Sequence, residues 1–224
     1  MAGSVILLLI FLRMERAMPA PMLDLSLFRQ RTFSAAAGSA LLNYVCVYTL
    51  LFLLPFYLLQ ARGLSTAQAG LLLTAQPLTM ALIAPLSGSV SDRIGTRLPS
   101  VLGMGLLAVG LWLMSGLTAD TPSLVFVARL GLAGLGIGIF VSPNNSALMG
   151  AAPSHRQGIA AGILALARNV GMVIGVGIAG AIYTTVLSHS GGSEAAGILD
   201  AVRVAYLLAA GIAVAGMGVA ALRS

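Results

Sequence analysis

The residues with the most evident chemistry lie in a ten-residue stretch between two long apolar runs. Asp92 and Arg93 are adjacent, Arg97 follows within the same stretch, and Gly88 and Gly95 lie on either side of the aspartate. A carboxylate beside guanidinium groups can form an ion pair, or it can face the positive end of a neighbouring helix. Both contacts can form and break again, so we interpret this stretch as an electrostatic latch.

The local sequence predicts that the latch is a short, stiff turn between two helices. Gly95 suits a left-handed residue that ends the first helix, and Thr96 can cap the second. Pro99 falls in the first turn of that second helix, where a missing amide hydrogen costs nothing. Gly88 allows a neighbouring backbone to approach closely.

The order Gly-x-x-x-Asp-Arg-x-Gly-x-Arg resembles the signature loop of the major facilitator superfamily, which joins the second and third helices of a six-helix half. Thr96 stands where the family usually has Arg or Lys. The resemblance implies a membrane transporter whose loop braces the cytoplasmic gate and releases it when the transporter turns inward. The alternative is that any short cytoplasmic loop collects arginines. The residues that take the gate role by resemblance are Gly88, Asp92, Arg93, Gly95 and Arg97.

The composition requires that the elements carrying this turn lie in a membrane. The chain is 58% hydrophobic and only 8% charged, with a mean hydropathy of +1.00, which is too apolar for a soluble domain of this size. A net charge of +6 would permit nucleic-acid binding. The arginines, however, lie in short connectors beside apolar runs, where they set membrane topology. We therefore expect the lipid bilayer, and no nucleic acid, as a partner.

Six apolar runs each approach the length of about 20 residues that a spanning helix needs. They predict an all-α polytopic membrane protein, and they cover residues 35–59, 69–90, 98–117, 124–149, 159–187 and 198–222. Only Arg62 and Arg203 flank the run ends on one side of the predicted bundle. Eight arginines flank the other, which the positive-inside rule places in the cytoplasm: Arg13, Arg16, Arg29, Arg31, Arg93, Arg97, Arg156 and Arg223. We expect a multi-pass protein of the cell membrane with both ends of the six-helix unit (35–224) cytoplasmic.

Two segments precede the six runs. Residues 1–12 are apolar but span only about 18 Å as a helix, so we expect the end of a longer, truncated membrane helix. Residues 13–34 form a polar cytoplasmic connector, and its part from Pro21 to Phe33 resembles the connector before the second half of fourteen-helix drug:proton antiporters. The resemblance implies a C-terminal half, with the missing N-terminal half or a second copy of the chain as its partner.

Polar residues inside spanning helices are costly unless they face a partner or a water-filled path. Tyr44 and Tyr48 lie one turn apart on one helix face, which could hold a flat, lipophilic or cationic molecule by stacking and cation–π contacts. The alternatives are an interfacial anchor and plain interhelical hydrogen bonds. The residues that we expect to line a cavity are Asn43, Tyr44, Gln76, Asn144, Asn145, Arg168 and Asn169.

Other features of the runs predict how the helices bend and pack. Pro77 and Pro85 should kink the second run, and Pro143 should break the helical ladder of the fourth run. Glycines spaced by four in the fifth run favour close helix contact. Arg129, near the outer end of the fourth run, must find a carboxylate or several carbonyl groups, or must extend to the lipid headgroups; we expect the last.

The function expected from these features is secondary active transport of a small molecule, namely proton-coupled efflux of a drug or metabolite. No Asp or Glu lies well inside any run, so a proton-carrying carboxylate must belong to the missing half. The two histidines lie in loops on opposite sides, which excludes a catalytic or metal set, so we expect no enzyme, no metal and no cofactor. The alternative is a non-transporting membrane subunit or the remnant of a truncated transporter gene.

Overall fold

The computed structural model describes residues 25–189 and 193–223, and in these ranges every regular element is a helix. The expected membrane helix at 1–12 and the connector up to residue 24 lie outside the described residues. A short 3₁₀ turn, η1 (Leu25–Arg29), leads into the first long helix. The remaining elements are α2 (Arg31–Pro55), η2 (Phe56–Ala61), α3 (Thr66–Leu73), α4 (Ala75–Ile94), α5 (Arg97–Ser115), α6 (Ser123–Ala151), η3 (Ser154–Arg156), α7 (Gln157–His189) and α8 (Glu194–Ala221).

Six segments of the described chain are helices long and apolar enough to cross a membrane, as the six apolar runs predict. Most helix ends extend a few residues past the apolar runs, because polar residues at a solvated helix end lower the hydropathy without ending the helix. The start of α2 at Arg31 is one example, since the predicted connector would have reached residue 34. The C-terminal ends of α5, at Ser115, and of α8, at Ala221, instead fall short of the predicted 117 and 222. The six spans are Arg31–Ala61, Thr66–Ile94, Arg97–Ser115, Ser123–Ala151, Ser154–His189 and Glu194–Ala221.

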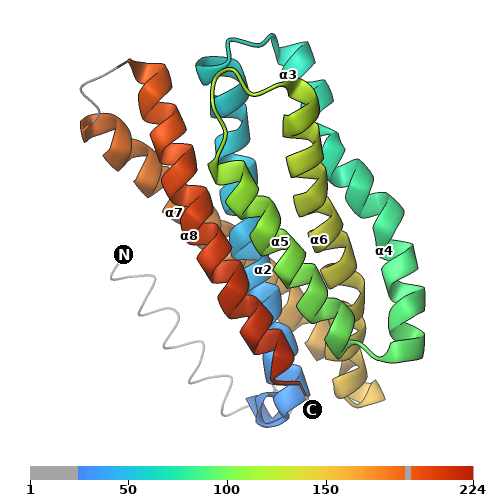
Figure 1. The fold of residues 1–224 in the computed structure, drawn as a ribbon. Helices are drawn as coiled ribbons and strands as arrows, with labels where there is room; N and C mark the ends of the chain where they lie inside the picture. Colours follow the sequence, from blue (N-terminus) through green and yellow to red (C-terminus); the bar gives the residue numbers. More distant parts are fainter. Residues whose placement is uncertain (1–24, 190–192, 224) are drawn as a thin grey trace, which may run out of the picture.

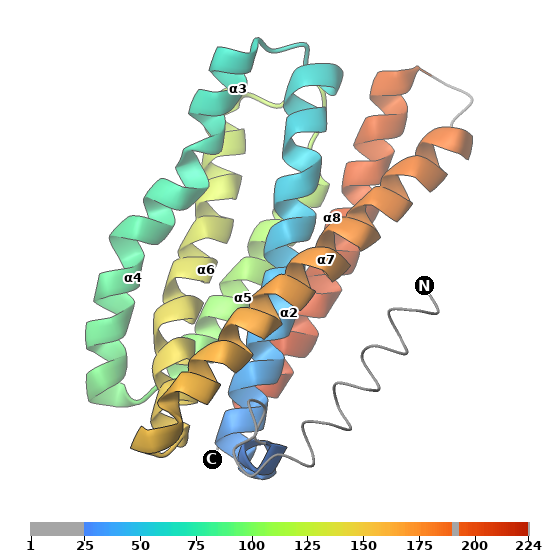
Figure 2. The ribbon, with the colours of Figure 1, turned by 180° about the vertical axis from the view of Figure 1, so that it is seen from behind.

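The six spans run alternately up and down, so that η1, the turn between α4 and α5, the turn between α6 and α7, and the end of α8 lie at one end of the bundle (Figures 1 and 2). We call this end, which carries Arg93, Arg97 and Arg156, the arginine-rich end. In the bundle, α6 packs mainly against α4 and α5, while α2 packs mainly against α7 and α8.

Two of the spans are poorly covered by the rest of the described chain. The span that contains α4 buries 11% of its most apolar window and the span of α7 buries 17%, whereas the other four bury 39% or more. In Figure 2, α4 lies at one side of the bundle and α7 crosses in front of α2. We call the exposed sides of α4 and α7 the open face.

The crossing of α7 over α2 depends on two glycines of α7. A methyl group at Gly175 would lie 2.5 Å from the carbonyl oxygen of Val45, and one at Gly171 would lie 2.7 Å from the Cβ atom of Tyr44. Only a residue without a side chain permits this approach. The predicted use of glycines spaced by four for close helix contact is therefore confirmed for this pair. It is wrong for Gly158 and Gly162, where an added Cβ would have no atom of the described residues within 4 Å.

Proline acts differently in the two helices where we expected it to bend the chain. Pro77 cannot bond to the carbonyl of Leu73, and α3 ends at Leu73, so the interruption at Thr74 lies one turn before the proline. In contrast, α6 continues through Pro143 to Ala151, so the proline interrupts the hydrogen-bond ladder, as predicted, without ending the helix. Pro85 is likewise accommodated inside α4.

Candidate functional site

The predicted turn joins α4 to α5 at the arginine-rich end. The first helix ends at Ile94, Gly95 takes φ +85° and ψ 165°, and the second begins at Arg97, with Pro99 in its first turn. That combination of angles is accessible almost only to glycine, which explains its place in the motif. The predicted cap is wrong, since the Thr96 side chain makes no capping hydrogen bond.

The charged residues of the turn are available for contact with another partner. Asp92, Arg93 and Arg97 are exposed, and none of them forms an ion pair within residues 25–189 and 193–223. Gly88 lies on the opposite, inward side of α4, where an added Cβ would lie 2.9 Å from the Ser142 hydroxyl of α6. The turn is thus held from inside the bundle while its charges face outward, and its role in a gate stays a prediction.

The same part of α4 repairs the backbone defect that Pro143 makes in α6. Proline has no amide hydrogen, so the Ile139 carbonyl loses its helical partner. The buried hydroxyl of Ser87 donates a 2.7 Å hydrogen bond to this carbonyl oxygen. Satisfaction of the freed group by a neighbouring helix allows α6 to pass the proline intact.

One residue beyond the proline, Asn144 lies in a buried polar cluster rather than in an open cavity. Its Oδ1 accepts hydrogen bonds from the Ser39 hydroxyl of α2, at 3.1 Å, and from Nη2 of Arg223. Nη2 of Arg223 also donates to Ser39 Oγ at 2.7 Å, and its Nη1 donates to Ser100 Oγ of α5 at 2.9 Å. The cluster therefore joins the arginine-rich ends of α2, α5, α6 and α8. Asn145 is only partly buried.

Sequence reasoning missed three members of this cluster, because Arg223 served only as a topology marker and the two serines are unremarkable in apolar helices. Arg223 is 2% exposed, and burial lowers the pKa of its guanidinium to about 10, which leaves it charged at neutral pH. Within the described chain its hydrogen-bond partners are all neutral oxygens. The sequence did contain one signal for the cluster: α2, α5 and α6 each carry a polar residue near the end that lies at the arginine-rich end of the bundle, and α8 is followed there by Arg223.

A second group of polar side chains lies beside the crossing of α2 and α7. Tyr44 is partly buried where Gly171 approaches it, and it lies in the neighbourhood of Arg168 of α7 and of Tyr48 on its own helix. Arg168 is exposed on the open face, and Asn169 is exposed next to it. Of the expected lining residues, the structure thus places Tyr44 and Arg168 near each other, while for Asn169 it shows only an exposed position beside Arg168.

Two expected lining residues lie in the core instead. Asn43 is fully buried, and its Nδ2 donates to the Met104 sulfur of α5 at 3.4 Å. Gln76 is buried where α4 lies against Gly134 of α6. Neither residue reaches the open face, because the helix face that carries it is used for packing.

Arg129 is bound by carbonyl groups, the alternative that the sequence analysis left open to it. Its Nη1 donates to the carbonyl oxygens of Leu113 at 2.9 Å and Gly116 at 3.1 Å. These carbonyls belong to the last turn of α5, where a cation is favoured and main-chain acceptors lack helical partners. Arg129 therefore caps α5 at the end of the bundle opposite the arginine-rich end.

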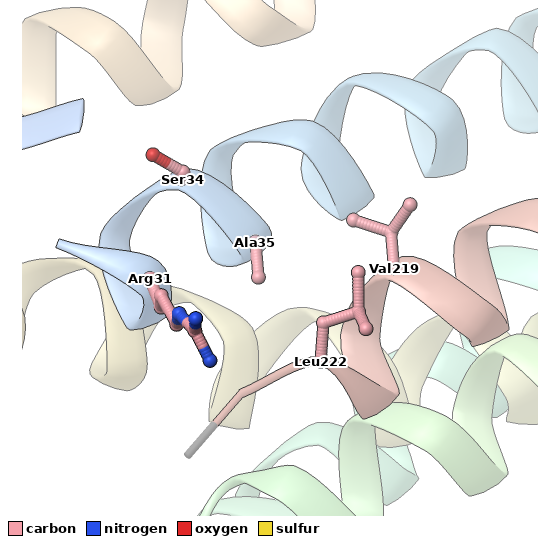
Figure 3. Close-up of a pocket in the computed structure, with 5 residues that line it drawn as sticks. All are labelled: Arg31, Ser34, Ala35, Val219 and Leu222. Carbon is pink, nitrogen blue, oxygen red and sulfur yellow. The ribbon is translucent and has the colours of Figure 1, made fainter. Parts of the chain in front are cut away.

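A cavity of about 520 Å³ lies near the buried cluster, between the start of α2 and the end of α8 (Figure 3). Arg31, Ser34, Ala35, Val219 and Leu222 line it, so that one cation faces a largely apolar wall. This lining offers no nucleophile with a base. Among the described residues no group of His, Cys, Asp or Glu could hold a metal ion.

Comparisons with known proteins identify relatives of this fold. The family model of the Major Facilitator Superfamily matches residues 36–223. The chain is 34% identical to riboflavin transporter RibZ of Clostridioides difficile over 83% of this chain and 41% of the relative. It is 32% identical to multidrug resistance protein Stp of Mycobacterium tuberculosis, over 80% of this chain and 33% of that protein. It is 30% identical to a tetracenomycin C resistance and export protein of Streptomyces glaucescens, over 94% of this chain and 42% of that protein. The chain thus spans well under half the length of each of these relatives.

Proposed function

Because the chain belongs to the major facilitator superfamily, we propose that its six spans form one half of a secondary transporter that exports a small molecule from the cell. The second half would be a further six-helix unit or a second copy of this chain. In this proposal the arginine-rich end lies in the cytoplasm, as the distribution of arginines favours.

The observation that carries the proposal is the place of Arg168. It is exposed about 16 Å along α7 from Gln157. A cation that faces lipid at the centre of a membrane helix costs about 2.5–3.5 kcal/mol on insertion scales. An aqueous cavity or a polar partner on the open face removes this cost, and a transport path between two halves supplies both.

The side chains around Arg168 favour a flat aromatic substrate. Tyr44 and Tyr48 offer ring faces for stacking, while Arg168 and Asn169 offer hydrogen-bond donors to polar groups at the edge of a ring system. The positive charge of Arg168 disfavours a cationic substrate at this point. One relative is named a riboflavin transporter and another a multidrug resistance protein, which supports riboflavin as a first probe.

Coupling to protons would need a carboxylate that the described spans do not offer at mid-depth. Asp92 lies in the last turn of α4, and Asp200 is an exposed residue near the start of α8. We therefore propose that the proton-accepting carboxylate belongs to the second half.

The test is export of riboflavin, followed by its fluorescence, from cells that lack their own efflux pumps. The chain is expressed alone and together with the N-terminal half of a relative. We expect export in at least one arrangement, its loss when a protonophore removes the proton gradient, and its loss in Asp92→Asn. Export by the chain alone supports a pair of identical halves, and export only with the second unit supports a split transporter. No export in either arrangement, for riboflavin or a panel of flat aromatic drugs, contradicts transport and favours a non-transporting subunit.

The role of Arg168 has its own variants. Arg168→Gln should reduce export at least tenfold, and Arg168→Lys should retain part of it. Arg203→Gln, which removes an exposed arginine near the opposite end of the bundle, is the matched control. Equal export by Arg168→Gln and the control would exclude Arg168 from the path.

A further inference from the structure

The turn between α4 and α5 carries the Gly-x-x-x-Asp-Arg-x-Gly-x-Arg motif, and we call it the signature turn. It has two arms, and both are attached to the same short segment of α6. The first arm is the last part of α4, from Ser87 to Ile94, and the second arm is the first turn of α5, from Arg97 to Ser100. The exposed charges of the turn make no ion pair within the described chain, so they cannot hold the arms themselves. The contacts that fix the turn must therefore come from the inward side of each arm.

The first arm is held at the residues that surround Pro143. Ser87 donates to the Ile139 carbonyl at 2.7 Å, and Gly88 admits the Ser142 hydroxyl close to its backbone. Both contacts lie within one turn of the proline. A side chain larger than glycine at position 88 would push against Ser142, so the fit is tight.

The second arm is joined to the same segment by hydrogen bonds that pass through Arg223. Ser100 closes the first turn of α5 by donating to the Thr96 carbonyl at 2.8 Å, and its oxygen accepts from Arg223 Nη1. The other terminal nitrogen of Arg223 donates to Asn144, the residue after Pro143, and to Ser39 of α2. The guanidinium thus lies between α5 and α6 and makes one connected set of hydrogen bonds with both.

We propose that Arg223 is a positioning residue for the signature turn, fixing its second arm to the Pro143 segment of α6 as Ser87 fixes its first. The planar guanidinium has five donors in a rigid arrangement, so it can hold oxygens of three helices at set directions. No carboxylate takes part among the residues described, and the acceptors around Arg223 are neutral. If the turn has the gate role that the family resemblance implies, this keeps the exposed Asp92, Arg93 and Arg97 in a fixed position.

The experiment measures the position of the signature turn relative to α6, so it does not depend on transport activity. Spin labels are attached at Ile94→Cys in the turn and Ser146→Cys in α6, both exposed positions, while the native Cys46 is buried and unreactive to the label. Double electron–electron resonance then gives the distribution of distances between them in detergent and in lipid. The variants are Arg223→Gln, Arg223→Lys, Ser100→Ala and Ser87→Ala. The control is Arg31→Gln, which removes an exposed arginine at the same end.

We expect Ser100→Ala and Ser87→Ala each to increase the population of displaced turns about fivefold, the factor that corresponds to one net hydrogen bond. Arg223→Gln should have the larger effect, and Arg223→Lys, which keeps the charge and three donors, should restore most of the narrow distribution. Arg31→Gln should change nothing. If Arg223→Gln fails to fold, Ser100→Ala decides the question, since it removes one hydroxyl from a helix that keeps its packing.

Two outcomes would overturn the proposal. One is an unchanged distance distribution in folded Arg223→Gln and Ser100→Ala. The other is an equal change in Arg31→Gln, which would show a general loss of charge at this end. A displaced turn in the Arg223 and Ser100 variants, with no riboflavin export by the unmodified chain or by any variant, would support the positioning role and contradict the transport function. The failure of one proposal can therefore be told apart from the failure of the other.

Discussion

The hydroxyl of Ser87 donates a hydrogen bond to the carbonyl oxygen of Ile139, the group in α6 that Pro143 deprives of its amide partner. A defect in one helix is thereby corrected by the helix that leads into the signature turn. The contact explains why α6 stays continuous through a proline, and it ties the motif to the interior of the bundle.

Ser87→Ala should destabilise the protein by about 1 kcal/mol, because the Ile139 carbonyl would remain buried without a partner. Thermal unfolding in detergent, followed by circular dichroism, measures the change. Ser89→Ala is the matched control, since Ser89 is exposed and bonds only within its own helix, to Leu86. Equal melting temperatures for the two variants would show that the interhelical bond contributes nothing.

Gly175→Ala should separate α7 from α2 and destabilise the protein by about 1–3 kcal/mol, the usual cost of overpacking. The added methyl group would meet the Val45 carbonyl oxygen at 2.5 Å and the Thr49 nitrogen at 3.1 Å, and backbone atoms cannot move aside as a side chain can. Gly177→Ala, where no atom lies within 4 Å, should be neutral or slightly stabilising. Unfolding by denaturant compares the pair, and a larger loss in Gly177→Ala would contradict the observed crossing.

Gly95→Ala should cost about 1–3 kcal/mol through backbone strain alone. Gly95 has φ +85°, but nothing lies within 4 Å of an added Cβ, so no steric contact with another residue contributes. Gly150, which also has open space around it but no positive φ, provides the control variant Gly150→Ala. The same melting experiment tests the difference, and a tolerant Gly95→Ala would mean that the turn can relax to an ordinary conformation.

Arg129→Met should lower stability by about 1–3 kcal/mol, because the carbonyls of Leu113 and Gly116 lose a charged donor at the end of α5. Methionine keeps an apolar stem of comparable length, which limits the packing change. Arg203→Met removes an exposed arginine near the same end of the bundle and should have little effect. Hydrogen exchange of the last turn of α5 measures the local effect, and unchanged protection there would contradict the capping role.

Several features of this protein could be predicted from local sequence. The number of spanning helices follows from the length of each apolar run, and the turn at Gly95 follows from a glycine between a charged helix end and a new helix start. The order of Asp92, Arg93 and Arg97 in that turn indicated the family that the comparison with known sequences identifies. These properties depend on a few consecutive residues and on the thickness of a membrane.

Only the tertiary structure decided which face of each helix points inward. These helices are apolar all round, so hydrophobic periodicity cannot assign a polar residue to the core or to a cavity. Asn43 and Gln76 therefore lie in the core, while Tyr44 is only partly buried and Arg168 is exposed on the open face. The partners of Arg129 and Arg223 follow the same rule, since both arginines bond to residues of other helices. A buried cation is stabilised by whichever oxygens the packing brings within reach, and only the assembled bundle determines that choice.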